Sequence, residues 1–187
     1  MYKIVTQPTS EPLSLKEAKD HLRVTGSEED SLINNLITAV RQEAEKYLNR
    51  VLIEQTWDMF LDKFPDDDGD IFIHKTPVTA VTSLQYYDAN NVLQTWARTN
   101  YDLDHYNEPA SIYPAYSISY PATLDTKNVV IIRFTAGYGD AGDVPDAIKS
   151  GMLLYLSYLY DNRGDATTTG IPHAVWNIWN NYRIQWL

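Results

Sequence analysis

The sequence predicts an α+β protein in which two N-terminal and two C-terminal helices form a helical bundle around an inserted, mostly antiparallel β-rich portion. Three observations lead to this class: apolar residues recur at helical spacing near both ends, the period changes to two from Gln55 onward, and the β-type runs are joined by short connections. The expected boundaries are 14–50 for the N-terminal helices, 53–136 for the β-rich insertion and 145–187 for the C-terminal helices and tail, within a single domain spanning 1–187.

The first helix is predicted to begin after Ser14, because Glu17 three residues later completes a capping-box pattern. Gly26 ends this short helix. A second helix begins at Ser27 with acidic residues in its first turn, where carboxylates favour the positive end of the helix dipole. Its apolar stripe is one face wide and consists of Leu32, Ile33, Leu36, Ile37, Val40, Ala44, Tyr47 and Leu48.

The β-rich portion opens with a half-buried strand from Gln55, with Trp57 and Met59 on one face and Asp58 on the other. The turn-rich stretch 65–70 follows, so we expect a hairpin between this strand and residues 71–74.

A second hairpin is predicted between residues 81–87 and 92–96, because Asp88–Asn91 has the composition of a turn. Residues 129–135 form an apolar, β-branched run that is typical of a buried strand.

The stretch 101–123 has no regular period, and we interpret it as a long ordered loop that carries contact surface. Its aromatic content argues against disorder. The expected contact residues are Tyr101, Tyr106, Tyr113, Tyr116 and Tyr120.

The C-terminal part predicts a third helix with Pro145 as its first residue and its end near Arg163. A polar linker, Thr167–Gly170, then leads to Pro172 and a short terminal helix. This last segment has more large apolar side chains than a short helix can bury on itself, so it either packs onto the second and third helices or docks on a partner. The residues concerned are Trp176, Ile178, Trp179, Tyr182, Ile184, Trp186 and Leu187.

The bulk composition favours an interaction protein. Aromatic residues make up 12% of the chain, mostly as 14 Tyr and 5 Trp, and such side chains are enriched at interfaces. The formal net charge of −10 argues against gripping DNA phosphates, although DNA could slide past such a surface. With no cysteine, no secretory signal and no apolar run that could span a membrane, we expect a soluble protein compatible with a reducing cytoplasm.

No motif in the sequence predicts catalysis, a cofactor or a metal. The acidic run Asp66–Asp70 lacks EF-hand spacing and is better explained as a solvated turn. The glycines of Thr135–Asp140 match only half of a nucleotide-binding fingerprint and are better explained as shaping a strand exit. The strongest remaining candidate for acid/base chemistry is His105 near Asp102, Asp104 and Glu108, for which a polar loop is the simpler interpretation.

The order and spacing of several segments resemble the head-tail connector (adaptor) family of long-tailed bacteriophages. The opening carries "EPLSLKEAKDHLRV" at 11–24, followed by "AEKYLNR" at 44–50 and "QTW" at 55–57. Later segments that match are "RFTAGYG" at 133–139 and the helix that follows Pro145.

This resemblance implies a non-enzymatic virion protein that forms a ring of about a dozen identical copies beneath the portal protein, with a bore through which DNA passes. The protein would then lie in the virion neck and, during assembly, in the host cytoplasm. The C-terminal segment would dock on the portal, and the tyrosine-rich stretch would meet a neighbouring subunit or a tail-side stopper or completion protein. Two alternatives remain: another neck ring protein, or a carbohydrate-binding module that uses the aromatic loop for stacking.

Overall fold

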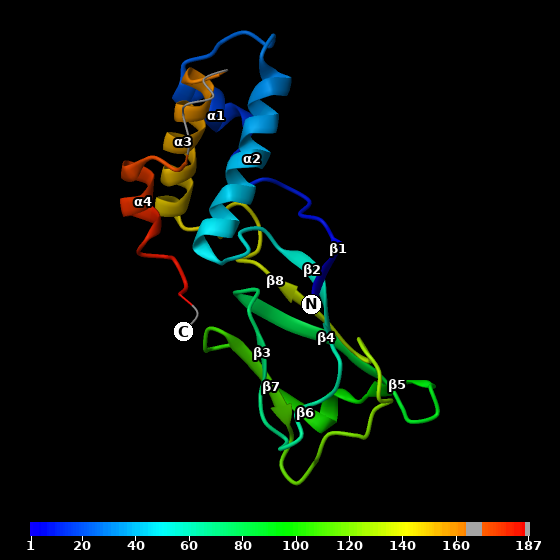
Figure 1. Cartoon of the computed structure of the whole chain (residues 1–187). Helices are drawn as coiled ribbons and strands as arrows, with labels where there is room; N and C mark the ends of the chain where they lie inside the picture. The colour runs from blue at the N-terminus through cyan, green and yellow to red at the C-terminus, as the bar shows by residue number, and fades with distance from the viewer. Residues whose placement is uncertain (164–169, 186–187) are drawn as a thin grey trace. The chain divides into compact units, whose positions relative to one another are not determined.

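The computed structural model describes residues 1–163 and 170–185. Its four helices and two antiparallel sheets confirm the α+β class (Figure 1). Within the described part of the chain, none of the helices is long and apolar enough to cross a membrane.

The chain divides into two compact units. The β unit comprises Met1–Pro8 and Glu54–Gly137, and the helical unit comprises Thr9–Ile53 and Tyr138–Leu187. The sequence did not indicate that the first residues join the β-rich part. The prediction of a single domain spanning 1–187 stays a prediction.

In the helical unit, α1 (Leu15–Leu22) begins at the predicted capping box. The Ser14 hydroxyl accepts a hydrogen bond from the Glu17 backbone N–H, and the Glu17 carboxylate accepts one from the Ser14 N–H at 2.8 Å. Next, α2 (Asp30–Leu48) starts three residues later than predicted, with Glu29 at its N-cap. Arg23 and Asn49 end the two helices in the left-handed conformation.

The C-terminal helices of this unit are α3 (Asp146–Asp161) and α4 (His173–Trp179), and Pro145 precedes α3 rather than opening it. Figure 1 shows α4 beside α3, in agreement with their contacts. The predicted linker residues Thr167–Thr169 lie outside the described residues.

A close approach between α3 and α4 depends on Gly151. A Cβ atom at this position would lie 2.2 Å from the Trp179 indole nitrogen, so no larger residue fits without movement. The same nitrogen donates a hydrogen bond to the Ile148 carbonyl at 3.1 Å. Gly151 and Trp179 therefore fix the position of α4 along α3.

One buried cation ties the start of the helical unit to its second helix. Arg41 is 5% exposed, and its guanidinium donates to the Glu11 carboxylate at 2.6 Å and to the Glu45 carboxylate at 3.0 Å. Glu45 also accepts a hydrogen bond from the Leu52 backbone N–H. Because each charge has a partner, this polar group is compatible with the apolar core around it.

The β unit contains two antiparallel sheets. The larger sheet has the strand order β1-β2-β8-β4-β5, and the smaller has the order β3-β7-β6. The strand bounds are β1 Tyr2–Thr6, β2 Gln55–Leu61, β3 Ile71–Ile73, β4 Val78–Tyr87, β5 Leu93–Trp96, β6 Tyr101–Asp104, β7 Ala110–Pro114 and β8 Val130–Ala136.

Two strand predictions for the larger sheet are confirmed. β4 and β5 form the predicted hairpin around the Asp88–Asn91 turn, and β8 is the buried central strand. Asp58 was expected to face solvent but is only 7% exposed, because Arg133 opposite it on β8 forms two hydrogen bonds with its carboxylate.

Two other β predictions are wrong. The expected hairpin between β2 and residues 71–74 does not form, because β2 pairs with β1 and β8 whereas β3 pairs with β7. The stretch 101–123 is not a continuous loop, since β6 and β7 pair within it as a hairpin. Tyr101 of β6 and Ala110 and Ile112 of β7 are buried in the unit, and this burial is the physical reason for the strand structure.

Candidate interaction surfaces

The C-terminal segment is divided between interior and surface. Trp179 is fully buried in the core of the helical unit, and Val175 is 1% exposed. Ile178 and Tyr182 pack partly against the same core. For these residues the structure shows packing within the unit, which was one of the two interpretations of the sequence.

Trp176, in contrast, is 44% exposed and lies in an aromatic cluster with Tyr47 of α2. The two rings are stacked, with centroids 6.0 Å apart and an interplanar angle of 19°. The Arg183 guanidinium carbon lies 4.9 Å from the Tyr47 ring centroid, and the Tyr47 hydroxyl hydrogen-bonds the Asn180 side chain. We call Tyr47, Trp176 and Arg183 the Trp176 cluster. Sequence reasoning placed Tyr47 in the core stripe and gave Arg183 no role.

The residues after α4 are fastened to the C-terminal end of α2. The Ile184 backbone N–H donates to the Leu48 carbonyl at 3.0 Å, and the Asn49 side chain donates to the Ile184 carbonyl at 2.8 Å. Arg50 donates to the Tyr182 carbonyl at 2.7 Å. These hydrogen bonds fix the path of the chain beside the Trp176 cluster. Trp186 and Leu187 lie outside the described residues.

The tyrosine-rich stretch is divided in the same way. Tyr101 is 2% exposed and stacks on Trp96 with ring centroids 5.6 Å apart. Tyr120 stacks on Phe64 at 4.6 Å, and its hydroxyl donates to the Gly69 and Ile112 carbonyls. These two tyrosines therefore hold the β unit together and offer little surface to a partner.

The Tyr120 hydroxyl has a strongly shifted titration. Burial raises its pKa above the ordinary value, and the nearby negative charges of Asp70 and Asp68 raise this pKa further. Asp68 also accepts a hydrogen bond from the Tyr120 backbone N–H at 2.8 Å. The acidic turn 66–70 thus has a structural role, in line with its interpretation as a turn.

Three of the five tyrosines predicted as contact residues are exposed. Tyr106 is 88% exposed, Tyr116 is 97% exposed and Tyr113 is 37% exposed. Tyr106 lies in the β6–β7 turn, which the Asp104 carboxylate stabilises by accepting hydrogen bonds from the backbone N–H groups of Tyr106 and Asn107. The Asn107 side-chain amide also donates to this carboxylate at 2.6 Å, and this bond, together with the backbone hydrogen bonds, lowers the pKa of Asp104, so its carboxylate stays ionised at neutral pH.

The outer face of the smaller sheet adds a residue that the sequence analysis missed. Phe72 of β3 is 48% exposed and lies opposite Ser111, two positions along β7 from Tyr113. Asp102 of β6 lies opposite Tyr113. The alternation of Ile71, Phe72 and Ile73 would have suggested an exposed aromatic residue had this three-residue segment been assigned to an outer sheet.

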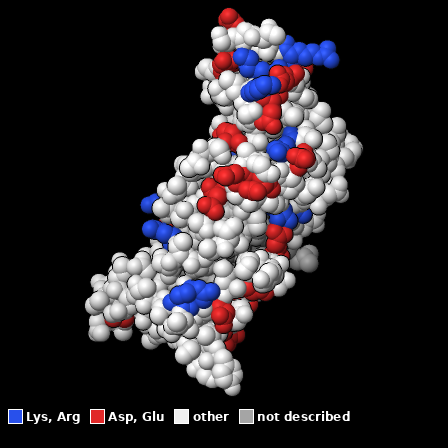
Figure 2. Space-filling model, turned by 180° about the vertical axis from the view of Figure 1, so that it is seen from behind, with Lys and Arg blue, Asp and Glu red and all other residues white. Residues whose placement is uncertain are grey.

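The structure shows neither a metal-ligand cluster among the described residues nor a broad basic area on the face drawn in Figure 2. No group of three or more His, Cys, Asp or Glu side chains among the described residues could hold a metal ion. His105 stacks on Tyr106 with ring centroids 4.4 Å apart. Figure 2 shows acidic and basic side chains interspersed on one face, with no broad basic area in that view of the described residues.

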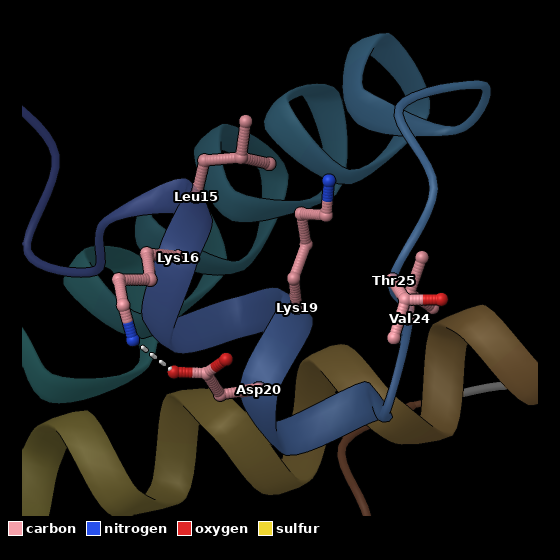
Figure 3. Close-up of a pocket in the computed structure, with 6 residues that line it drawn as sticks. All are labelled: Leu15, Lys16, Lys19, Asp20, Val24 and Thr25. Atoms are coloured by element: carbon pink, nitrogen blue, oxygen red, sulfur yellow. Dashed lines mark hydrogen bonds and ion pairs between the residues drawn. The ribbon is translucent and has the colours of Figure 1, made fainter.

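A depression of about 540 Å³ beside α1 is lined by two lysines, Lys16 and Lys19 (Figure 3). The Lys16 ammonium pairs with Asp20 at 2.6 Å, and Lys19 pairs with Asp30 at 2.5 Å and donates to the Gly26 carbonyl. Because both cations have anionic partners within the unit, this depression is a poor phosphate site.

The described residues form an α+β scaffold that exposes aromatic side chains on each of its two units, the residue types that are enriched at protein interfaces. The chain belongs to the phage gp6-like head-tail connector family, whose family model matches residues 12–112. This match confirms the resemblance drawn from the opening segments. The segments 133–139 and beyond lie outside the matched range.

Comparison with solved structures extends the likeness to the whole chain. A chain in the neck of an empty gene transfer agent particle, computed with C6 symmetry, is 23% identical with a TM-score of 0.82, over 100% of this chain and 97% of that chain. A chain in the virion of the native gene transfer agent particle is 24% identical with a TM-score of 0.82, with the same coverage. A chain in the native neck, computed with C12 symmetry, is 22% identical with a TM-score of 0.75, again over 100% and 97%.

At these identities the structural matches show a shared fold. No curated protein matched the sequence significantly. Family membership and fold together support a structural, connector-type role in a phage-like neck.

Proposed function

We propose that this protein forms a ring of about a dozen copies that binds beneath the portal protein, lets DNA pass through its bore and works without catalysis. Family membership supports the connector role, and the similar chains in necks computed with C6 and C12 symmetry support a ring. The protein would assemble in the host cytoplasm and end in the virion neck.

The Trp176 cluster carries the proposal for portal docking. Trp, Tyr and Arg are the residue types that most often dominate binding energy at interfaces, and here all three meet on one surface. The hydrogen bonds to Leu48, Asn49 and Arg50 fix the backbone beside them, so little conformational entropy is lost on binding. Of the predicted docking residues, Trp176 is the central contact in this proposal, together with Ile178, Tyr182 and Ile184, whereas Trp179 is buried in the core. Trp186 and Leu187, also predicted for docking, lie outside the described residues.

A second surface is assigned to the tail-side partner or a neighbouring subunit. Its centre is Tyr113 and Phe72 on the outer face of the smaller sheet, with the exposed Tyr106 in the β6–β7 turn and the exposed Tyr116 after the other end of β7. The acidic residues Asp102 and Asp104 lie on the same sheet face, so this surface would favour a partner with basic and apolar side chains.

The net charge of −10 supports the proposal of a DNA conduit. A surface with more acidic than basic groups attracts no phosphate backbone, and DNA can therefore move past it without being held.

The docking proposal is tested by measuring portal binding of Trp176→Ala, with Tyr116→Ala as the matched control. Both positions are exposed aromatic residues, so neither change should disturb the fold. We expect Trp176→Ala to weaken portal binding by about 2 kcal/mol or more and Tyr116→Ala to leave it unchanged. Normal portal binding by Trp176→Ala would remove the cluster from the interface, and selective loss with Tyr116→Ala would move the portal contact to the tyrosine-rich surface.

A further inference from the structure

The larger sheet of the β unit has two open edges. The strand order places β1 at one end and β5 at the other, and the backbone hydrogen bonds of the described residues give neither strand a second neighbour. Edge strands with free N–H and C=O groups are templates for pairing with another chain. Each edge is therefore a position where the strand of another chain could pair.

The hydrogen-bond pattern shows which backbone groups face outward on β5. The Asp88 N–H donates to the Val92 carbonyl, and hydrogen-bonded pairs then recur at every second residue. Gln94 and Trp96 consequently bond to β4, whereas Leu93 and Thr95 direct their N–H and C=O groups to the free edge. Tyr87, which lies opposite Leu93, directs its backbone N–H away from β5 and donates it to the carbonyl of Val129, the residue before β8. This is the direction that the alternation requires.

The backbone groups of β1 also alternate between the neighbouring strand and the free edge. Met1 and Phe60 exchange two backbone hydrogen bonds, so Lys3, opposite Asp58, also bonds to β2. Tyr2 and Ile4 then direct their N–H and C=O groups outward. Each edge thus offers two residues whose backbone groups are free to pair.

The side chains along the two edges are complementary. β1 exposes Val5 at 43%, and β5 exposes Leu93 at 44% with Val92 beside it at 51%. Lys3 is the one charged residue in the sequence of β1, and Asp88 is the one charged residue in the sequence of residues 87–96. Asp88 precedes β5, and its carboxylate accepts hydrogen bonds from the Asn90 and Val92 N–H groups and from the Gln94 side chain. The β1 edge therefore combines exposed aliphatic surface with a positive charge, and the β5 edge combines it with a negative charge in the adjoining turn.

We propose that β1 of one copy pairs with β5 of the next copy, so that the larger sheets of neighbouring subunits join edge to edge around the ring. This inference rests on the proposed ring. Adjacent strands in the sheet are antiparallel and there are five of them, so β1 and β5 run in the same direction. Copies related by rotation about an axis along the strands keep that direction, so the new pair is parallel.

This contact is heterologous, because two different edges meet. Heterologous contacts build closed rings when the rotation between copies closes. Pairing of β5 with β5, or of β1 with β1, would instead be two-fold symmetric and would stop at a dimer. The two arrangements predict different products from one experiment.

The absence of cysteine in the wild-type chain makes disulfide cross-linking a clean test. Lys3 and Thr95 lie on the same face of the sheet, because directly paired residues share a face and so do residues two apart on one strand. The connecting pairs are Lys3–Asp58 between β1 and β2, Phe60–Ile131 between β2 and β8, Ile131–Gln85 between β8 and β4, and Gln85–Thr95 between β4 and β5. Side chains opposite each other on paired strands have Cβ atoms about 5 Å apart, close to disulfide range. Two double variants, Lys3→Cys with Thr95→Cys and Lys3→Cys with Leu93→Cys, cover two registers on this face.

The full-length variants are assembled with the portal protein, oxidised and separated without reductant. We expect at least one double variant to give a ladder of covalent oligomers that ends at the ring size, and each single-cysteine variant to stay largely monomeric. Wild-type rings without a ladder from either double variant would overturn the edge pairing and leave the ring intact. Dimers from single variants would also overturn it, and wild-type chains that form no ring even with the portal would remove the proposed function as well.

A proline variant supplies an independent test. Thr95→Pro removes an N–H that faces the free edge and leaves the hydrogen bonds to β4 in place, so the subunit should fold with nearly unchanged thermal stability. We expect ring assembly to weaken by about tenfold, through loss of the hydrogen bond and the clash of the proline ring. The control Gln94→Pro removes a hydrogen bond inside the sheet and should lower thermal stability. Unchanged assembly by Thr95→Pro would contradict the proposal.

Discussion

The two aromatic-rich segments of this protein have similar composition but use it differently. In the C-terminal segment, Trp176 and Trp179 are three residues apart on one short helix, and one is 44% exposed while the other is fully buried. In the tyrosine-rich stretch, Tyr101 and Tyr120 are 19 positions apart in the sequence and are both part of one interior aromatic group, while Tyr106 and Tyr116 between them point outward.

This difference teaches that aromatic content predicts an interaction protein but does not identify the contact residues. On a helix, the direction of a side chain is set by its angle around the axis, so neighbours three residues apart share only part of a face. In the β unit, the direction is set by strand alternation and by turns. Substitutions of these aromatic side chains should therefore reduce stability most where the ring is buried and least where it is exposed.

The largest effect is expected for Trp179→Ala. This change removes a fully buried indole and its hydrogen bond to Ile148, so it should lower the free energy of unfolding by about 3–5 kcal/mol. Urea denaturation followed by circular dichroism measures the loss. A loss below about 1 kcal/mol would mean that the helical core can close around the cavity or does not depend on this side chain.

A smaller effect is expected for Tyr120→Phe, which keeps the stacking on Phe64 and removes the hydroxyl that donates to two carbonyls. At neutral pH the loss should be about 1 kcal/mol in the free energy of unfolding, measured by urea denaturation.

The same variant gives a prediction about alkaline pH. Since burial raises the pKa of Tyr120 in the folded state, the folded protein holds this proton more tightly than the unfolded chain. Stability from this group is therefore present below about pH 10, the ordinary tyrosine value, and is lost as the pH rises above it. Stability curves between neutral and alkaline pH should fall less steeply for Tyr120→Phe than for the wild type.

For Trp176→Ala we expect a stability loss of less than about 1 kcal/mol, because nearly half of the side chain is already exposed and the change removes mainly the stacking on Tyr47. Thermal unfolding would show a small shift, in contrast to Trp179→Ala. A loss as large as that of Trp179→Ala would indicate that Trp176 supports the fold rather than a partner contact.

The smallest effect is expected for Tyr116→Ala. Its side chain is 97% exposed, so the free energy of unfolding should change by no more than about 0.5 kcal/mol. If a neighbouring subunit or tail-side partner covers this residue, the same variant should bind that partner more weakly. Calorimetry of the subunit and a binding measurement on the assembled neck separate the two readouts.

Much of the helical unit could be predicted from the sequence because its signals are local. The Ser14–Glu17 capping box and the apolar stripe of α2 depend on residues within one or two turns of each other, and both are confirmed. The start of α2 was placed three residues early, since the acidic residues there fit both a first turn and the preceding loop.

The β unit was harder to predict because its pairing is non-local. β1 pairs with β2 across more than 50 residues, and β3 has only three residues, too few for a clear alternation. In the stretch 101–123, the lack of a regular period suggested a loop, but β6 and β7 are short strands of four and five residues, and Pro109 and Pro114 lie at the ends of β7, where proline is tolerated. The sequence could name exposed tyrosines, but the separation of Tyr101 and Tyr120 from the others required the fold.

The contact between Gly151 and Trp179 has a consequence for engineering this scaffold. The space left by a missing Cβ and the hydrogen bond of one indole nitrogen together determine where α4 rests on α3. A designer who grafts a foreign recognition peptide after residue 180 should therefore keep these two positions as a pair. Substituting either residue alone would shift α4 and so change the position from which the grafted peptide extends. Retaining both residues keeps that position the same for different peptides.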